Sequence, residues 1–139
     1  MKDWVFGLAM SAVILGMVAS MFLISGCGMT TAQRISMTGD SAYNLKEVAA
    51  PAWSAICKVK AEKCVADGVT ASKDCAPWVS CQAGLKGFYL AHVAVQTGVQ
   101  KAAWWILQGD ESTAKKVIMV AMDSLARAYK LAQAEGAFK

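Results

Sequence analysis

The stretch CKVKAEKCVADGVTASKDCAPWVSC, residues 57–81, contains four of the five cysteines of this chain. Cys57 and Cys64 are seven residues apart before Gly68, and Cys75 and Cys81 are six residues apart after it. On two helices these separations correspond to rises of about 10 Å and about 9 Å. An antiparallel helical hairpin that turns near Gly68 would therefore bring the four cysteines together in two pairs.

A nested pairing would join Cys57 to Cys81 and Cys64 to Cys75, and it is one of three ways to pair four cysteines. On the chain-entropy model, closing the inner loop contributes about 3 kcal/mol to stability. Zinc sites usually place two to four residues between paired cysteines, whereas here six and five residues intervene. The Cys-x-x-Cys spacing of redox pairs and c-type haem sites does not occur. We therefore expect disulfides, no metal and no cofactor.

Apolar residues recur at intervals of three and four in three segments of the chain, and this periodicity predicts three helices. The first two helices would be the two arms of the hairpin. The first would be capped by Asp40 or Ser41 and would stop near Gly68. Pro51 lies inside it and predicts a kink or a restart. Its expected inward side chains are Leu45, Val48, Ala52, Ile56 and Val59.

The second helix would begin after Ser72 or Asp74, because Pro77 is tolerated in a first turn, and would end near Gly109. Glycine inside a helix costs about 1 kcal/mol relative to alanine, so glycines in this segment predict close helix approach or, alternatively, room for a ligand. The small residues in question are Gly84, Gly87, Ala91, Ala94, Gly98 and Ala102. The expected inward side chains are Leu85, Phe88, His92, Val95, Val99 and Ile106.

The third helix would be capped by Asp110 or Ser112 and closed by Gly136. Its expected inward residues are Ala114, Val117, Ile118, Ala121, Leu125, Ala128 and Ala132, and its outward ones are Lys115, Lys116, Asp123, Arg127 and Lys130. No segment shows the sustained alternation of a strand. The sequence therefore predicts an all-α fold, a small antiparallel three-helix bundle that contains a disulfide-stapled helical hairpin.

Residues 4–24 form an apolar run without a charged side chain. As a helix this run would be about 30 Å long, which matches the hydrocarbon core of a bilayer. It is followed by Ser25-Gly26-Cys27, and the sequence from Leu23 to Cys27 resembles the lipobox of bacterial lipoproteins. The resemblance covers only this export segment. It implies that residues 1–26 are a signal peptide, and that diacylglycerol and an acyl chain such as palmitate on Cys27 attach the protein to a lipid bilayer.

An uncleaved signal anchor is the alternative, because the apolar run exceeds the usual 7 to 15 residues and Asp3 offsets the charge of Lys2. The chain would then be a bitopic membrane protein. Gly28 stands where the lipoprotein family's inner-membrane retention signal has Asp. The resemblance therefore implies attachment to the outer membrane, facing the periplasm, if the host is Gram-negative. Residues 27–39 lack periodicity and are predicted to be a flexible tether to a helical domain at 40–139.

Few residues of the sequence are candidates for a catalytic role. His92 is the only histidine and lies on an apolar helix face, which favours a core role. An enzymatic role would require His92 beside a carboxylate in an open cleft. Asp110 and Glu111 fit the start of a helix, where negative charge is favourable, better than an acid–base pair. We therefore expect no catalytic residues.

The tryptophans are the remaining candidates for binding. Trp104 and Trp105 point to different sides of one helix, so we expect one in the core and the other partly exposed, in contact with lipid or a partner. Trp53 and Trp78 are expected to pack over the disulfides. The net charge of +4 is spread along the helices without a basic run, so no nucleic-acid binding is expected.

Together these features predict a non-catalytic, lipid-tethered module that binds another protein of the cell envelope. Small helical lipoproteins that serve secretion or conjugation systems, and those that exclude phages or plasmids, resemble it in general plan. The alternative function is a carrier that binds a lipid or another apolar molecule between helices lined by the small residues. A carrier predicts an internal cavity.

Overall fold

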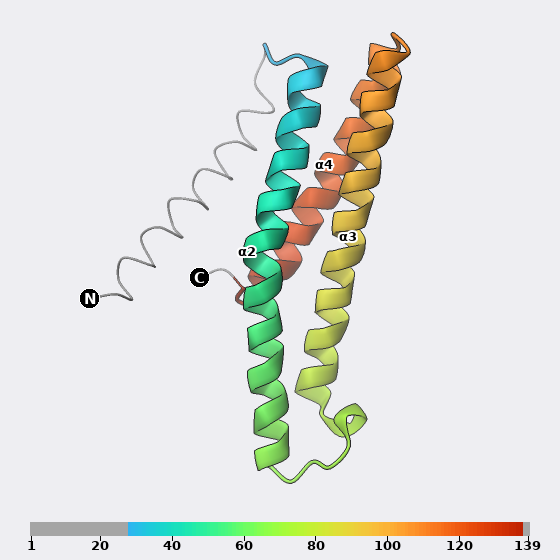
Figure 1. Cartoon of the computed structure of the whole chain (residues 1–139). Coiled ribbons are helices and arrows are strands. Elements are labelled where there is room, and N and C mark those ends of the chain that lie inside the picture. Colours follow the sequence, from blue (N-terminus) through green and yellow to red (C-terminus); the bar gives the residue numbers. More distant parts are fainter. Residues whose placement is uncertain (1–27, 138–139) are drawn as a thin grey trace, which may run out of the picture.

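The computed structural model describes residues 28–137, and within them three α-helices form an antiparallel bundle (Figure 1). Helix α2 spans Thr31–Ala66, α3 spans Ala76–Leu107 and α4 spans Glu111–Ala134. A short 3-10 helix, η1, spans Ser72–Asp74 between α2 and α3. No strand occurs in residues 28–137, which confirms the predicted all-α three-helix bundle. The export segment, 1–26, and Cys27 lie outside the described residues.

Helix α2 begins earlier than predicted. The Gln33 N–H donates to Thr30 Oγ1 at 3.2 Å, and the Thr30 N–H donates to Gln33 Oε1 at 2.9 Å. This capping box satisfies two backbone donors and starts the helix at Thr31. The tether predicted for residues 27–39 was therefore wrong from Thr31 onward. Asp40 lies inside the helix and is exposed, so its predicted role as the cap was also wrong.

Polar side chains lie on the buried face of this first part of α2. Thr31 and Thr38 are buried beside Ile35. The Thr38 hydroxyl donates to the Arg34 carbonyl at 2.7 Å, so its burial leaves no unsatisfied donor. Ile35 joins a small core cluster whose other buried members are Ala102, Ile118 and Ala121.

The prediction for the rest of α2 was right in part: Leu45 is buried, and Ala52 and Ile56 are half-buried against the core. Val59, an expected inward residue, has 63% of its surface exposed. The buried positions carry mainly small residues, and α2 is one helix through the exposed Pro51, so the predicted restart does not occur. Small side chains bury little area by themselves but let neighbouring helices approach. The buried residues of this part are Ala42, Leu45, Ala49, Ala50, Trp53 and Cys57.

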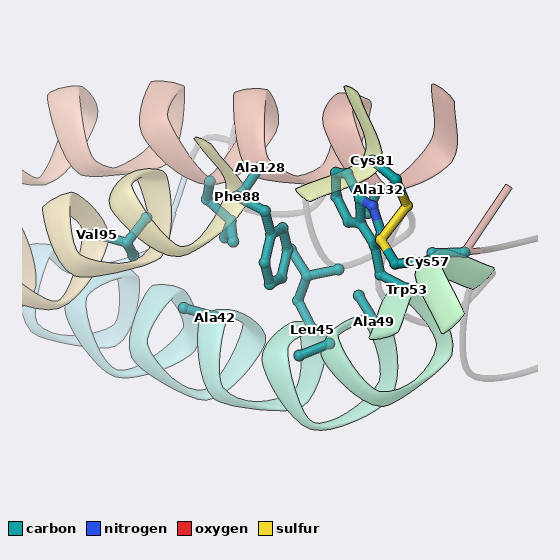
Figure 2. Close-up of a cluster of buried hydrophobic side chains, with 13 residues drawn as sticks. Ala42, Leu45, Ala49, Trp53, Cys57, Cys81, Phe88, Val95, Ala128 and Ala132 are labelled. Carbon is teal, nitrogen blue, oxygen red and sulfur yellow. A yellow bond between two sulfur atoms is a disulfide. The ribbon is translucent and has the colours of Figure 1, made fainter. Parts of the chain in front are cut away.

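The main core lies between all three helices, around Trp53. This ring is fully buried, with its centroid 5.7 Å from that of Phe88. It lies beside the Cys57–Cys81 disulfide, as Figure 2 shows. A Cβ at Gly84 would lie 2.8 Å from Trp53 Cζ2, so glycine there leaves room for the indole.

The inner disulfide, Cys64–Cys75, crosses a part of the hairpin that α4 does not cover. Helix α4 has 24 residues and α2 has 36, a difference of about 18 Å in length. Near the end of α4, Lys60 Nζ lies 2.9 Å from Glu135 Oε2, and beyond this level α2 and α3 continue without α4 (Figure 1). Two helices bury little core, so covalent links supply stability that packing does not.

Both disulfides have the nested pairing that the spacing favoured. Cys57 and Cys81 join with their Cα atoms 5.6 Å apart, and Cys64 and Cys75 join with theirs 5.8 Å apart. The chain turns between the two helices at Gly68, whose φ is +84°, a conformation that favours glycine. The predicted disulfide-stapled hairpin is therefore present.

Helices α3 and α4 approach closely at Gly98. A Cβ at this position would lie only 2.6 Å from Ala121 Cβ, closer than two carbon atoms can pack. A Cβ at Gly87 would instead meet Leu131 Cδ1 at 3.7 Å, an ordinary contact. Close helix approach, one of the two expectations for the small residues of this segment, therefore occurs at Gly98.

We predict opposite effects of alanine at these two glycines. Gly98→Ala should destabilise the protein by about 1–3 kcal/mol, because the new methyl group forces α3 and α4 apart. Gly87→Ala should stabilise it by about 0.5–1 kcal/mol through helix propensity. Urea unfolding of both variants followed by circular dichroism measures the difference. Equal midpoints for the two variants would contradict the close approach at Gly98.

Candidate interaction surface

The side of α3 that faces away from the core presents a regular row of exposed residues. Its members recur at alternating intervals of four and three residues, the spacing with which one helix contacts another in a coiled coil. Leu90 and Val93, at the middle of the row, are 62% and 56% exposed. We call this row the outer α3 face: Val79, Ala83, Lys86, Leu90, Val93, Thr97, Gln100, Trp104 and Leu107.

The outer α3 face is almost uncharged. Helix α3 contains no Asp or Glu, and Lys86 is the one charged residue of the face. The exposed side of α4 differs, because charges of both signs lie on it beside the exposed Met119 and Val120. The charged residues are the predicted outward ones, Lys115, Lys116, Asp123, Arg127 and Lys130, all of them exposed.

Helix α3 is therefore apolar on two sides. Its inner side packs Phe88 and Val95 into the core, while its outer side exposes Leu90 and Val93. Contiguous exposed apolar residues on a small protein typically mark a binding surface. This outer face was not predicted from the sequence, where only the inner side of the segment was assigned. The sequence feature that could have revealed it is the set of positions from Val79 to Leu107 that are alternately four and three residues apart.

The paired tryptophans lie near the end of α3. Trp104 is 52% exposed and belongs to the outer α3 face, whereas Trp105 is half-buried. Their ring centroids are 4.6 Å apart in an edge-to-face arrangement. The two residues thus occupy different environments, as expected, although neither is fully in the core.

A cleft of about 290 Å³ lies at the turn of the hairpin, lined in part by Trp78, Cys64 and Cys75. Its volume is at the lower end of the range for small-molecule sites. The carrier hypothesis required space along the small residues of α3 instead. At Gly84 and Gly98 that space is occupied by Trp53 and Ala121.

His92 is buried, with 4% of its surface exposed, so it does not lie in an open cleft. Among the described residues its Nε2 atom has no hydrogen-bond partner. Burial, and secondly the positive charge of Lys46, lower the pKa of His92 below its ordinary value of 6.5. The imidazole is therefore neutral in the fold at neutral pH.

The carboxylates at the start of α4 have structural contacts. Asp110 Oδ1 accepts from the Thr113 N–H at 2.9 Å, and Oδ2 accepts from the Thr113 hydroxyl at 2.6 Å. These hydrogen bonds hold the pKa of Asp110 below its usual value. Glu111 Oε1 accepts from the Thr31 hydroxyl at 2.8 Å, which links the starts of α2 and α4. Asp110 is therefore the helix cap that the sequence predicted.

Two other possibilities for residues 28–137 are a metal site and a membrane-spanning helix. No group of three or more His, Cys, Asp or Glu side chains in this range is arranged to hold a metal ion. None of the helices described in this range combines the length and the apolar character that crossing a bilayer requires.

The lowered pKa of His92 predicts a loss of stability in acid. The unfolded chain takes up a proton near pH 6.5, whereas the folded chain takes it up only at lower pH. The free energy of unfolding should therefore be highest above pH 6.5 and fall as the pH drops from there to the folded pKa. Urea unfolding of wild type and His92→Gln between pH 8 and pH 5 measures this. The slope should be smaller in His92→Gln, and equal slopes would contradict the burial of a neutral His92.

Comparison of the chain with models of known protein families, with curated proteins and with solved structures found no match.

Proposed function

We propose that this protein is a non-catalytic module, tethered to a membrane, that binds another protein of the cell envelope through the outer α3 face. The observation that carries the proposal is the coiled-coil spacing of the outer α3 face, whose exposed large apolar residues are Val79, Leu90, Val93, Trp104 and Leu107 and whose only charge is Lys86. Water contact with such a row is unfavourable, and burial against a partner removes it. The burial of His92 outside any open cleft supports a non-catalytic role.

The chemistry of the face indicates the kind of partner. Alternating intervals of four and three residues suit a partner that presents a helix, because knobs of one helix fill holes of the other. Burying an unpaired charge is costly, so a nearly uncharged face favours a partner that is also apolar and weakly charged. The small, exposed residue Ala94 flanks the row and leaves room for close approach.

The membrane tether in this proposal rests on the sequence before the bundle. The apolar run 4–24 and the lipobox-like residues that end at Cys27 support lipid attachment, with an uncleaved signal anchor as the alternative. In a Gram-negative host, Gly28 after the lipidated Cys27 favours the outer membrane. An accessory role in secretion or conjugation and a role in excluding phages or plasmids would both use the same docking face.

Introducing negative charge on the outer α3 face tests the proposal. The variant Leu90→Glu/Val93→Glu, expressed with an affinity tag in the native host, should lose the envelope protein that copurifies with wild type from crosslinked membranes. The matched control is Met119→Glu/Val120→Glu, two α4 residues that are 54% and 64% exposed. The control should retain the partner, because α4 already presents a charged surface.

Both variants should keep the far-ultraviolet circular dichroism of wild type, since all four positions are exposed. Loss of the same protein from both variants, or from neither, would contradict docking through the outer α3 face. If the copurifying protein is a second copy of this chain, the module is a homodimer and the proposed envelope partner is wrong.

A further inference from the structure

The start of α2, the end of α3 and the start of α4 meet at one end of the bundle (Figure 1). We call this the anchor end, and define it by Thr30, Leu107 and Glu111. The Thr31 hydroxyl bond to Glu111 holds α2 and α4 together there. Cys27 precedes Thr31 by four residues, which span at most about 14 Å. Any lipid attached to Cys27 therefore lies close to the anchor end.

The anchor end exposes large apolar side chains. Leu107, the last residue of α3, is 82% exposed, more than any other large apolar residue with an exposed side chain in residues 28–137. Trp104, one turn earlier, is 52% exposed. Tryptophan is enriched at membrane–water interfaces, where its ring meets the acyl chains and its N–H meets the headgroups.

Basic side chains lie at the same end of the bundle. A hollow of about 440 Å³ at the anchor end is lined by Met29, Thr31, Arg34, Glu111, Ser112 and Lys115. Arg34 and Lys115 are its cations, and the single carboxylate, Glu111, already accepts the Thr31 hydroxyl. Lys116 lies near Asp110 and contributes to the lowering of its pKa. With Lys101 also one turn from Trp104, positive charge exceeds negative charge at this end.

From these features we infer that the anchor end of the bundle rests on the anionic headgroup surface of the bilayer that holds Cys27. Trp104 and Leu107 enter the interfacial layer, and Arg34 and Lys115 contact lipid phosphates beside it. This inference rests on the membrane attachment in the proposed function, and it adds a second, direct contact between the folded bundle and the lipid.

The contact would also orient the molecule. Helix α3 has 32 residues and is about 48 Å long, so the disulfide-bonded hairpin turn would stand about that far from the bilayer surface. Leu90 and Val93 would then lie above the headgroups, where a protein partner can reach them. Lipid contact would thus use the Trp104 and Leu107 end of the outer α3 face, and partner docking would use the middle of that face, around Leu90 and Val93.

Quenching of Trp104 by brominated phospholipid tests this inference without a partner protein. The purified full-length chain is reconstituted into vesicles of phosphatidylcholine, with or without phosphatidylglycerol, and its flotation with the vesicles is measured first. The fluorescence emission of Trp104 is obtained by subtracting the spectrum of Trp104→Phe from that of wild type. We expect bromine near the headgroups to quench this emission in the vesicles that contain phosphatidylglycerol, and raised ionic strength to reduce the quenching.

Charge reversal provides the matched comparison. Lys115→Glu/Lys116→Glu should lower the ratio of docked to undocked protein about fivefold for each basic side chain removed. Lys58→Glu/Lys63→Glu makes the same charge change at exposed positions toward the opposite end of α2 and should leave quenching unchanged. Equal effects of the two pairs would overturn the inference.

The failures of the two proposals are distinguishable. A chain that floats with vesicles while Trp104 stays unquenched overturns the lipid contact alone. A chain that does not float overturns both the membrane attachment and the lipid contact. Docking of a protein partner is tested separately at Leu90 and Val93, because the vesicles contain no other protein.

Discussion

The Cys57–Cys81 disulfide lies where the three-helix core gives way to the two-helix end of the hairpin. Both cysteines are buried against Trp53, so the bond is part of the core as well as a covalent link. It fixes where α2 and α3 lie relative to each other along their axes. The second disulfide, Cys64–Cys75, links the two helices in the part of the hairpin beyond the end of α4. With that relative position fixed, Gly84 meets the Trp53 ring. The side of α3 that faces the core, and hence the side that faces water, follows from this one constraint.

The outer α3 face is a consequence of how the inner side is packed. Small residues such as Gly98 and Ala121 bring α3 and α4 into close contact, so the inner side needs few large side chains. Larger apolar residues, Leu90 and Val93, nevertheless occupy the outside, where they contribute nothing to the core of the bundle. A bundle that needed only to fold would gain solubility from charged residues at these positions, as on α4. Their presence is the main argument for a partner.

Much of the fold could be predicted from particular residues. The cysteine spacing predicted the hairpin, Asp110 predicted the start of α4, and the apolar periodicity of α4 predicted its buried face. The start of α2 was missed because Thr30 and Gln33 form a capping box inside a segment rich in Thr and Ser, where Ile35 and Met37 are too few to show a helical period. On α2 the prediction held for Leu45 but missed the buried Ala42, Ala49 and Ala50, because small residues give a weak apolar signal, and it wrongly placed Val59 inward. The outer α3 face was missed because a helix of a small bundle was assumed to have one apolar side. The lipobox-like sequence at Cys27 lies outside the described residues and stays a prediction.

Site-specific photocrosslinking in living cells tests the docking role of α3 most directly. A photoreactive amino acid is placed at position 93 on the outer α3 face or, for comparison, at position 119 on α4, which has nearly the same exposure. Docking through α3 predicts a crosslinked adduct with one envelope protein from position 93 and little from position 119. Adducts of equal yield from both positions, or an adduct from position 119 alone, would contradict the account.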